Sequence, residues 1–222
     1  GESTRPGAIS VSVKEEINRT IPVIEEIRKF SNISISIDTY KSEVAEKALL
    51  AGADFINDIS GFTFDSRMME IVKKFDVPVV LMHIKGTPQD MQTNPTYIDV
   101  IKDLLEFFSF QINKALDFGI KKVQIIIDPG IGFGKQLNDN FILIRRLKEF
   151  SELGFPILIG PSRKSFIGLT LDSPPEYRLE GTLAAVSAGI LNGASIVRVH
   201  DVKEVKRTVI ITDKIMGTDT QV

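Results

Sequence analysis

Six short apolar runs in this sequence each end in a polar or charged side chain of the kind that binds or transforms small molecules. These side chains are Asp38, Asn57 with Asp58, His83, Asp128, the Ser162-Arg163-Lys164 run, and Arg198 with His200. In a parallel α/β barrel the carboxyl ends of the strands converge on one mouth, so all of them would face one cavity. An open, doubly wound sheet would bring only a few of them together. A polar end on each of six strands favours a functional interpretation over solubility alone.

Two carboxylates and an amide stand out among these residues. Asp38, Asn57 and Asp128 can together donate and accept hydrogen bonds along a flat, amide-rich edge, such as that of a guanidine-like heterocycle. The alternative for Asp38 is an N-cap of a helix opening at Tyr40, which is the more common role for an isolated Asp. Asp58 is predicted to serve the following loop, because neighbouring residues on a strand point in opposite directions.

Three basic side chains lie at or after the ends of the last two predicted strands. Lys164 lies in a Gly-Pro-Ser loop, where an ammonium could contact a polarised carbonyl or ring nitrogen, although a solvated loop lysine is more common. Arg198 and His200 alternate on the last strand, so their side chains share a face, and the arginine fork matches phosphate oxygens. A lone histidine is usually structural, but this pairing indicates an anion site.

The run Gly130-Ile131-Gly132-Phe133-Gly134-Lys135 resembles a phosphate-binding loop but lacks its spacing. Gln136 stands where the loop's magnesium-binding hydroxyl belongs. We therefore interpret the run as a tight loop between strand and helix that brings the backbone and the Phe133 ring close to a ligand.

The elements that must position these residues alternate along the chain. Strands are expected at residues 34–37, 55–56, 78–81, 123–127, 156–159 and 195–199. Helical spacing of apolar residues runs from Val13 to Ile27, with a kink expected at Pro22, and from Ile98 to Ala115. Short strand–helix alternation predicts parallel strands, and the chain opens on a loop. The echo of Leu50-Ala51-Gly52 in Leu191-Asn192-Gly193 supports a repeated helix end.

Composition bounds the class of protein. The 222 residues, 43% apolar and 25% charged, predict a single globular domain over residues 1–222 with a short frayed tail from Thr218 to Val222. The net charge of −2 argues against nucleic-acid or anionic-membrane partners. The absence of cysteine excludes disulfides, thiolate metal sites and a cysteine nucleophile. No apolar run reaches the ~20 residues of a membrane span and residues 1–7 do not form a signal peptide, so a cytoplasmic protein is expected.

A family resemblance covers the whole chain. The residues that carry it are GESTRPG at 1–7, Ile37-Asp38-Thr39, NDISG at 57–61, Met82-His83, DPGIGFGK at 128–135, SRKS at 162–165 and RVHD at 198–201. In this order they resemble the motifs of dihydropteroate synthases. The resemblance implies an α/β fold, the (β/α)8 TIM barrel, and a reaction that joins 6-hydroxymethyl-dihydropterin diphosphate to p-aminobenzoate with release of diphosphate. By analogy it favours the barrel over the open sheet.

The resemblance also implies roles for single residues. The implied pterin-binding residues are Asp38, Asn57, Asp128 and Lys164, with Ile59 and Met82 packing on the ring and Gly132 and Gly160 lining the site. Arg198 and His200 are implied to anchor the diphosphate. Thr4, Arg5 and Pro6 correspond to a mobile loop that, with Phe133 and Ser165, shapes the aminobenzoate site. Asp38, Lys164, Arg198 and His200 are the implied catalytic residues.

The chain departs from the family at its beginning. The family's first two strands have no counterpart here, so a barrel without them is expected. The asparagine that holds Mg2+ in the family lies in that part, so Mg2+ is an implied cofactor with no ligand expected in this chain. A homodimer is also implied. Two rivals remain: a pterin-binding methyltransferase with a corrinoid partner, which would not need the Arg198 and His200 anion site, and a non-catalytic pterin-binding module.

Overall fold

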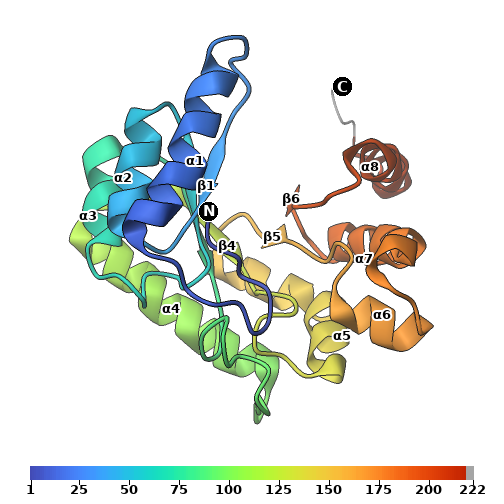
Figure 1. Ribbon diagram of the computed structural model, residues 1–222. Helices are drawn as coiled ribbons and strands as arrows, with labels where there is room; N and C mark the ends of the chain where they lie inside the picture. The colour runs from blue at the N-terminus through green and yellow to red at the C-terminus, as the bar shows by residue number, and fades with distance from the viewer. Residues whose placement is uncertain (219–222) are drawn as a thin grey trace. The chain divides into compact units, whose positions relative to one another are not determined.

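A computed structural model describes residues 1–218, in which helices and strands alternate along the chain (Figure 1). The strands are β1 (Ser36–Asp38), β2 (Phe55–Asp58), β3 (Val79–Met82), β4 (Ile125–Asp128), β5 (Leu158–Ile159) and β6 (Ile196–Val197). The α-helices are α1 (Val13–Arg28), α2 (Ser42–Leu50), α3 (Met68–Phe75), α4 (Val100–Phe118), α5 (Leu137–Arg145), α6 (Ser165–Leu171), α7 (Leu179–Leu191) and α8 (Val202–Met216). Short 3-10 helices are η1 (Lys122–Gln124), η2 (Leu147–Leu153) and η3 (Pro175–Tyr177). These residues form two compact units.

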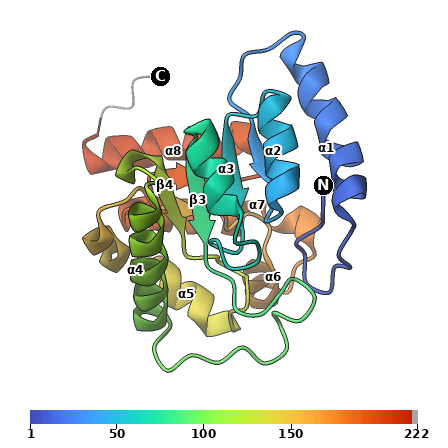
Figure 2. The ribbon, with the colours of Figure 1, turned by 90° about the vertical axis from the view of Figure 1, so that its left-hand side faces the viewer.

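Unit 1 comprises Gly1–Met91 and Phe107–Ile127. Its sheet has the order β1-β2-β3-β4, and the pairs β1–β2 and β2–β3 are parallel. Helices α1, α2 and α3 pack successively against one another beside these strands (Figure 2). Most of the β-branched strand residues of this unit are buried, among them Ile56, Val79 and Val80, which explains why these runs are apolar.

Helix α1 confirms the predicted apolar spacing. The Ser12 hydroxyl caps it by accepting a hydrogen bond from the Glu15 backbone N–H at 3.2 Å, and Glu15 lies in the first turn, where the helix dipole favours a carboxylate. The helix continues through Pro22 to Arg28 without a break. The kink expected at Pro22 stays a prediction.

Unit 2 comprises Gln92–Glu106 and the chain from Asp128 onward. Strands β5 and β6 pair in parallel, with Leu158 opposite Ile196 and Ile159 opposite Val197. Helices α7 and α8 pack against each other around a buried core. That core consists of Val186, Ile190 and Val205, with Leu183, Val197, Val199 and Val209 packed against it.

Most strand limits differ from the predicted ones by one or two residues, and three differences bear on the site or on the helices. Residues 122–124 form a 3-10 helix ahead of β4, because the Gln124 side chain accepts from the Lys121 N–H at 2.7 Å and donates to the Val77 carbonyl at 2.9 Å. Strand β6 is limited to Ile196–Val197, so Arg198 and His200 follow the strand. The Ile98 side chain is fully exposed ahead of α4, so its contribution to the apolar spacing was wrong.

Residues 1–218 contain six strands, the predicted number, and the pairs β1–β2, β2–β3 and β5–β6 are parallel, as predicted. The absence of the family's first two strands and the single domain over residues 1–222 stay predictions. Apart from Thr218, the tail predicted for residues 218–222 lies outside the described residues. Within residues 1–218, no helix combines the length and apolar character needed to cross a lipid bilayer.

Candidate functional site

The ends of β1 and β2 bring Asp38 and Asn57 together in unit 1. The strand register places them opposite each other, and the Asn57 Nδ2 donates a hydrogen bond to the Asp38 Oδ1. Asn57 is buried, and among the described residues its Oδ1 has no hydrogen-bond partner. Since a buried carbonyl oxygen without a donor costs about 1–3 kcal/mol, this acceptor suits an N–H of a ligand.

The capping role considered for Asp38 is wrong. Helix α2 begins at Ser42, and its N-cap is Lys41. The Asp65 carboxylate, from another segment, accepts from the Ser42 backbone N–H at 2.8 Å. The Asp38 side chain instead lies at the strand end, where it accepts a hydrogen bond from Asn57.

Asp58 serves the loop after β2, as predicted from strand alternation. Its carboxylate accepts hydrogen bonds from the Ser60 N–H at 2.9 Å, the Ser60 hydroxyl at 2.7 Å and the Phe62 N–H at 2.8 Å. Burial raises the pKa of Asp58, and these hydrogen bonds oppose the rise. The turn that they form holds Ile59, whose side chain is buried.

Apolar and aromatic side chains surround the end of β3. Met82 closes the strand and is buried. The ring of the next residue, His83, meets the edge of the Phe107 ring with centroids 4.8 Å apart, and Phe107 in turn packs on Phe108. The strand-end histidine thus lies within a cluster of rings of unit 1.

Thr4, Arg5 and Pro6 lie in a surface loop of unit 1. The Ala8 N–H donates to the Arg5 carbonyl at 3.0 Å, closing a turn with Pro6 and Gly7 at its centre. Gly7 has a φ of +76°, the left-handed conformation that the third position of a type II turn requires. The Gly7 N–H donates to the Pro88 carbonyl at 3.0 Å, so the loop's tip is attached to the segment after β3.

Asp128 ends β4 and is buried in unit 2. Its Oδ1 accepts a hydrogen bond from the Gly130 N–H at 2.8 Å. Burial raises the pKa of Asp128, whereas the positive charges of Lys164, Lys135 and Arg198 and the Gly130 hydrogen bond act to lower it. The carboxylate therefore lies in the field of three cations.

The glycine-rich loop after Asp128 holds Lys164. The Lys164 Nζ donates to the Ile131 carbonyl and lies 4.4 Å from the centroid of the Phe133 ring. Gly132 has a φ of +81°, and a Cβ there would lie 2.9 Å from the Lys164 Cδ, so only glycine leaves room for the lysine. The tight backbone predicted here is confirmed, and the groups it presents contact an ammonium.

Sequence reasoning missed a second lysine in this loop. Lys135 is buried, and its Nζ donates to the Phe133 carbonyl at 2.8 Å and to the Gly130 carbonyl at 3.2 Å. The Tyr97 hydroxyl donates to the Gly134 carbonyl at 2.6 Å, and burial raises the pKa of Tyr97. The sequence did offer a sign of Lys135, because this lysine ends the glycine-rich run 130–135.

Arg198 and His200 follow β6, immediately before α8. The β5–β6 register places Gly160 beside Arg198, whose Cβ lies 3.8 Å from the position that a Gly160 Cβ would take. The Lys164 Nζ lies 4.0 Å from the same position. The His200 Nδ1 is 2.8 Å from the Ser162 hydroxyl oxygen, and the His200 side chain is otherwise exposed. Two cations and a histidine thus gather where α8 begins, which favours an anion.

Arg163, although it belongs to the same polar run, is held by another group. Its Nε donates to the Asp201 carboxylate at 2.9 Å, and its Nη2 donates to the second oxygen. This hydrogen-bonded pair lowers the pKa of Asp201. The Arg163 backbone has a φ of +56°, and its N–H donates to the Thr182 hydroxyl at 3.0 Å. Arg163 therefore shapes the loop that carries Ser162 and Lys164.

Ser165 is the exposed first residue of α6, and it borders a cavity of unit 2 with a volume of about 270 Å³. The other lining residues are Gln92, Asn94, Pro95, Lys135, Gln136, Leu137, Asn140, Phe166 and Leu169. The described residues contain no group of three or more His, Asp or Glu side chains placed to hold a metal ion.

Comparison with known proteins gives consistent matches over most of the chain. A family model described as "Pterin binding enzyme" matches residues 1–200. The dihydropteroate synthase of Synechocystis sp. is 50% identical over 214 residues, which are 96% of this chain and 74% of that protein. The crystal structure of the Yersinia pestis dihydropteroate synthase with a sulfonamide drug has a TM-score of 0.95 at 39% identity, covering 98% of this chain and 79% of that one.

The dihydropteroate synthase of Clostridium difficile, solved in the presence of pteroic acid, is also similar, with a TM-score of 0.92 at 44% identity. That match covers 97% of this chain and 80% of the other. Neighbours of this similarity indicate an α/β TIM-barrel fold, which confirms the barrel fold class over the open doubly wound sheet.

Proposed function

This chain belongs to the dihydropteroate synthase family of pterin-binding enzymes, and from that premise we propose that the polar side chains at its strand ends carry out the family's reaction. The chain is a transferase of folate biosynthesis, which condenses a pterin diphosphate with p-aminobenzoate. Relatives this similar carry the synthase name, which leaves a methyltransferase and a non-catalytic pterin binder without a supporting observation.

The observation that carries the proposal for the pterin is the buried Asn57 carbonyl without a partner among the described residues. With its Nδ2 committed to Asp38, Asn57 presents an acceptor that a ring N–H of the pterin would satisfy. In our assignment the Asp38 carboxylate accepts a hydrogen bond from a second N–H of the pterin. Ile59 and Met82 pack on the face of the pterin ring. These groups come from strand ends, which are rigid supports for recognition.

In unit 2, Asp128 and Lys164 complete the assignment of pterin-binding groups. The cations around Asp128 oppose the rise in its pKa that burial causes, and its carboxyl oxygens would accept hydrogen bonds from an amino-substituted heterocycle. Lys164, held by the Ile131 carbonyl and the Phe133 ring, would donate to a carbonyl or nitrogen of the ring. Gly132 and Gly160 would contribute by leaving room for these side chains.

Arg198 and His200 are proposed to bind the diphosphate. Because the His200 Nδ1 is bonded to Ser162, its Nε2 is the nitrogen that would face a phosphate oxygen. The N-terminus of α8 begins two residues later and adds backbone N–H groups. The bond between the methylene carbon and the diphosphate oxygen breaks with both electrons leaving on oxygen, and these groups stabilise that charge.

The remaining steps follow from charge. Loss of diphosphate leaves a cationic methylene conjugated to the pterin, and the Asp38 carboxylate would stabilise the positive charge. The neutral amine nitrogen of p-aminobenzoate then forms the new C–N bond and releases a proton. No covalent intermediate with the protein is required by this scheme.

Mg2+ remains part of the proposal as a partner of the diphosphate. When bound it would neutralise charge on the phosphate oxygens. The donors near Arg198 in this chain are cationic, and Asp201 is paired with Arg163, so these residues do not supply the oxygen ligands that Mg2+ prefers. The scheme therefore assigns no step to the metal. A homodimer and a cytoplasmic location likewise stay predictions.

The second substrate is assigned to Thr4, Arg5, Pro6, Phe133 and Ser165, which lie in loops or at a helix start. Sulfonamide and pteroic acid, named with two similar structures, are consistent with such a site. Because loops are easily displaced, we expect p-aminobenzoate or a sulfonamide to bind tightly only after pterin and diphosphate, with a coupling of ~1–3 kcal/mol. Titration of a sulfonamide with and without pterin plus diphosphate measures this, and equal affinities would refute the order.

A turnover assay tests the function as a whole. The protein is mixed with 6-hydroxymethyl-dihydropterin diphosphate, p-aminobenzoate and Mg2+, and diphosphate and dihydropteroate are measured. Equal amounts of both products are expected. Pterin binding without diphosphate release would make the chain a binding module and contradict the catalytic proposal.

A further inference from the structure

Glu2 lies next to the loop of residues 3–10, which carries Thr4, Arg5 and Pro6. The Glu2 carboxylate accepts hydrogen bonds from four groups. Its Oε1 accepts from the Tyr40 hydroxyl at 2.6 Å, and its Oε2 accepts from the Lys41 Nζ at 2.5 Å. Oε2 also accepts from the Val11 N–H at 3.0 Å and the Ser10 hydroxyl at 3.2 Å. One side chain thus joins the start of the loop to its end.

Lys41 binds both the start and the end of this loop. Its Nζ donates to the Glu2 carboxylate, to the Glu16 Oε2 at 2.7 Å and to the Val11 carbonyl at 2.7 Å, so all three of its N–H bonds have acceptors. The side chains are 13% exposed for Lys41, 6% for Glu2 and 1% for Glu16, which separates this cluster from ordinary surface ion pairs. We call these three residues with Tyr40 the loop clamp.

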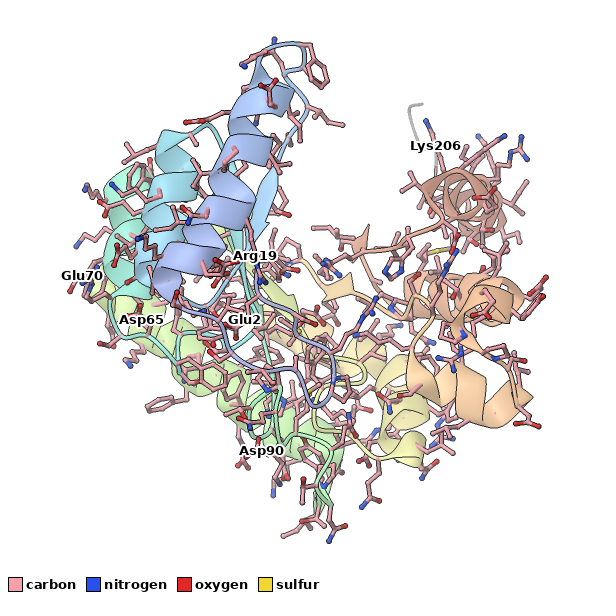
Figure 3. The ribbon with its side chains drawn as sticks, in the orientation of Figure 1. Glu2, Arg19, Asp65, Glu70, Asp90 and Lys206 are labelled. Atoms are coloured by element: carbon pink, nitrogen blue, oxygen red, sulfur yellow. The ribbon has the colours of Figure 1, made fainter. Side chains whose placement is uncertain are left out.

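The contacts within the loop clamp stabilise the charged forms of Glu2 and Lys41. Burial disfavours the ionised Glu2, but the hydrogen bonds from Lys41 and Tyr40 outweigh it and lower the pKa of Glu2. Burial likewise opposes the charge on Lys41, and the two carboxylates overcome it and raise the pKa of Lys41. Arg19 of α1 adds a hydrogen bond to the Gly1 carbonyl at 3.2 Å, and Figure 3 shows Arg19 and Glu2 at this end of the helix.

The rest of the loop has few anchors of its own. Residues 3–10 are mostly exposed, with Ile9 82% exposed, and their tip is held by the Gly7 hydrogen bond to the Pro88 carbonyl. A short loop whose ends are bound together moves as a unit about that base. The positions of Thr4 and Pro6 therefore depend on the clamp.

We propose that Glu2 and Lys41 are positioning residues for the second substrate, which act by fixing the base of the loop that carries Thr4, Arg5 and Pro6. The inference rests on the proposed function only for the identity of that substrate. Since Asp38, Asn57 and Asp128 lie at strand ends, outside this loop, the clamp affects capture of p-aminobenzoate and leaves pterin binding unchanged.

The test compares Glu2→Gln with Glu26→Gln in the whole protein. Glu2→Gln removes the negative charge that is bonded to Lys41 and Tyr40. Glu26 instead forms an exposed pair with Lys29 at the C-terminal end of α1, at 66% and 67% exposure. We expect the KM for p-aminobenzoate to rise about tenfold in Glu2→Gln, with the dissociation constant of a pterin analogue unchanged. Glu26→Gln should have the same KM for p-aminobenzoate and the same dissociation constant for the pterin analogue as the wild type.

Two further measurements guard against a trivial loss of folding. Tyr40→Phe deletes one hydrogen bond to Glu2 and should raise the same KM about threefold, and Lys41→Arg should keep most of the function. Hydrogen exchange at the Val11 amide, which is bonded to Glu2, should quicken in Glu2→Gln and stay slow in Glu26→Gln.

The outcomes separate this inference from the proposed function. A wild-type protein that releases no diphosphate refutes the proposed function, whatever the Val11 exchange shows. If the wild type is active, an unchanged KM in folded Glu2→Gln or Tyr40→Phe refutes the clamp. A parallel loss of pterin affinity refutes it too, because the clamp would then support the whole fold rather than one loop.

Discussion

Asp58 in unit 1 and Asp128 in unit 2 occupy equivalent places, each at the end of a buried parallel strand and each accepting the N–H of the residue two positions later. Burial raises the pKa of both carboxylates. They differ in what surrounds them, since Asp58 is held by neutral donors of its own turn and Asp128 lies among the charges of Lys164, Lys135 and Arg198.

The difference separates a structural carboxylate from a functional one. Neutral N–H and O–H donors of neighbouring residues define a local turn and are already satisfied without a ligand. Removing cations from water costs free energy, and the cations around Asp128 do not form a local turn with it. Their presence there therefore indicates a charged or polar ligand. Four variants test this distinction, beginning with the largest expected effect.

Asp58→Asn is expected to destabilise the protein by about 3 kcal/mol, because the new amide group would place a donor against a donor of Ser60 or Phe62. Urea denaturation monitored by circular dichroism measures the loss. Asp76→Asn, at an exposed left-handed helix end that tolerates asparagine, is the matched control and should be neutral. A stable Asp58→Asn protein with weakened pterin binding would reverse the two roles.

Asp128→Asn is expected to weaken pterin binding by roughly 1–3 kcal/mol, the loss expected when a buried charged hydrogen bond becomes neutral. Calorimetry with a pterin analogue measures it directly. Denaturation should show a much smaller loss of stability than in Asp58→Asn. Unchanged affinity would remove Asp128 from the site.

Arg198→Ala and His200→Ala are expected to weaken binding of a pterin that bears diphosphate about tenfold more than binding of a pterin without phosphates. The reason is that both residues lie beside the start of α8 rather than at the ends of β1 or β2. Competition binding with the two ligands gives the ratio. Equal losses with both would mean that these residues support the fold and not the anion.

The smallest effect concerns pH and stability. Because folding raises the pKa of Asp128 above the unfolded value of about 3.9, this group favours the folded state at low pH and loses that contribution as the pH rises through its folded pKa. The stability of Asp128→Asn relative to the wild type should therefore rise with increasing pH, because the wild-type carboxyl must lose its proton and the amide cannot. Urea midpoints across a range of pH test the sign, and a difference that does not change with pH would contradict it.

Much of the fold and of the candidate site could be predicted locally. The β-branched runs and the three-to-four spacing of Val13, Ile17, Ile21 and Ile24 follow from the geometry of a strand and a helix, and the structure contains both. The loop role of Asp58 followed from the alternation of strand side chains. The limits of β4 and β6 could not be predicted, since hydrogen bonds such as that of Gln124 to the distant Val77 carbonyl decide them.

The sequence by itself determined which polar groups end the strands, because strand periodicity and side-chain chemistry are properties of neighbouring residues. Only the tertiary structure decided their partners. The register of β1 and β2 puts Asn57 against Asp38, and the glycine loop delivers Lys164 to the Ile131 carbonyl, 33 residues away. Lys41 meets Glu2 across 39 residues. Such contacts arise from chain packing, because a buried charge or carbonyl is stabilised by a partner that can come from a distant part of the chain.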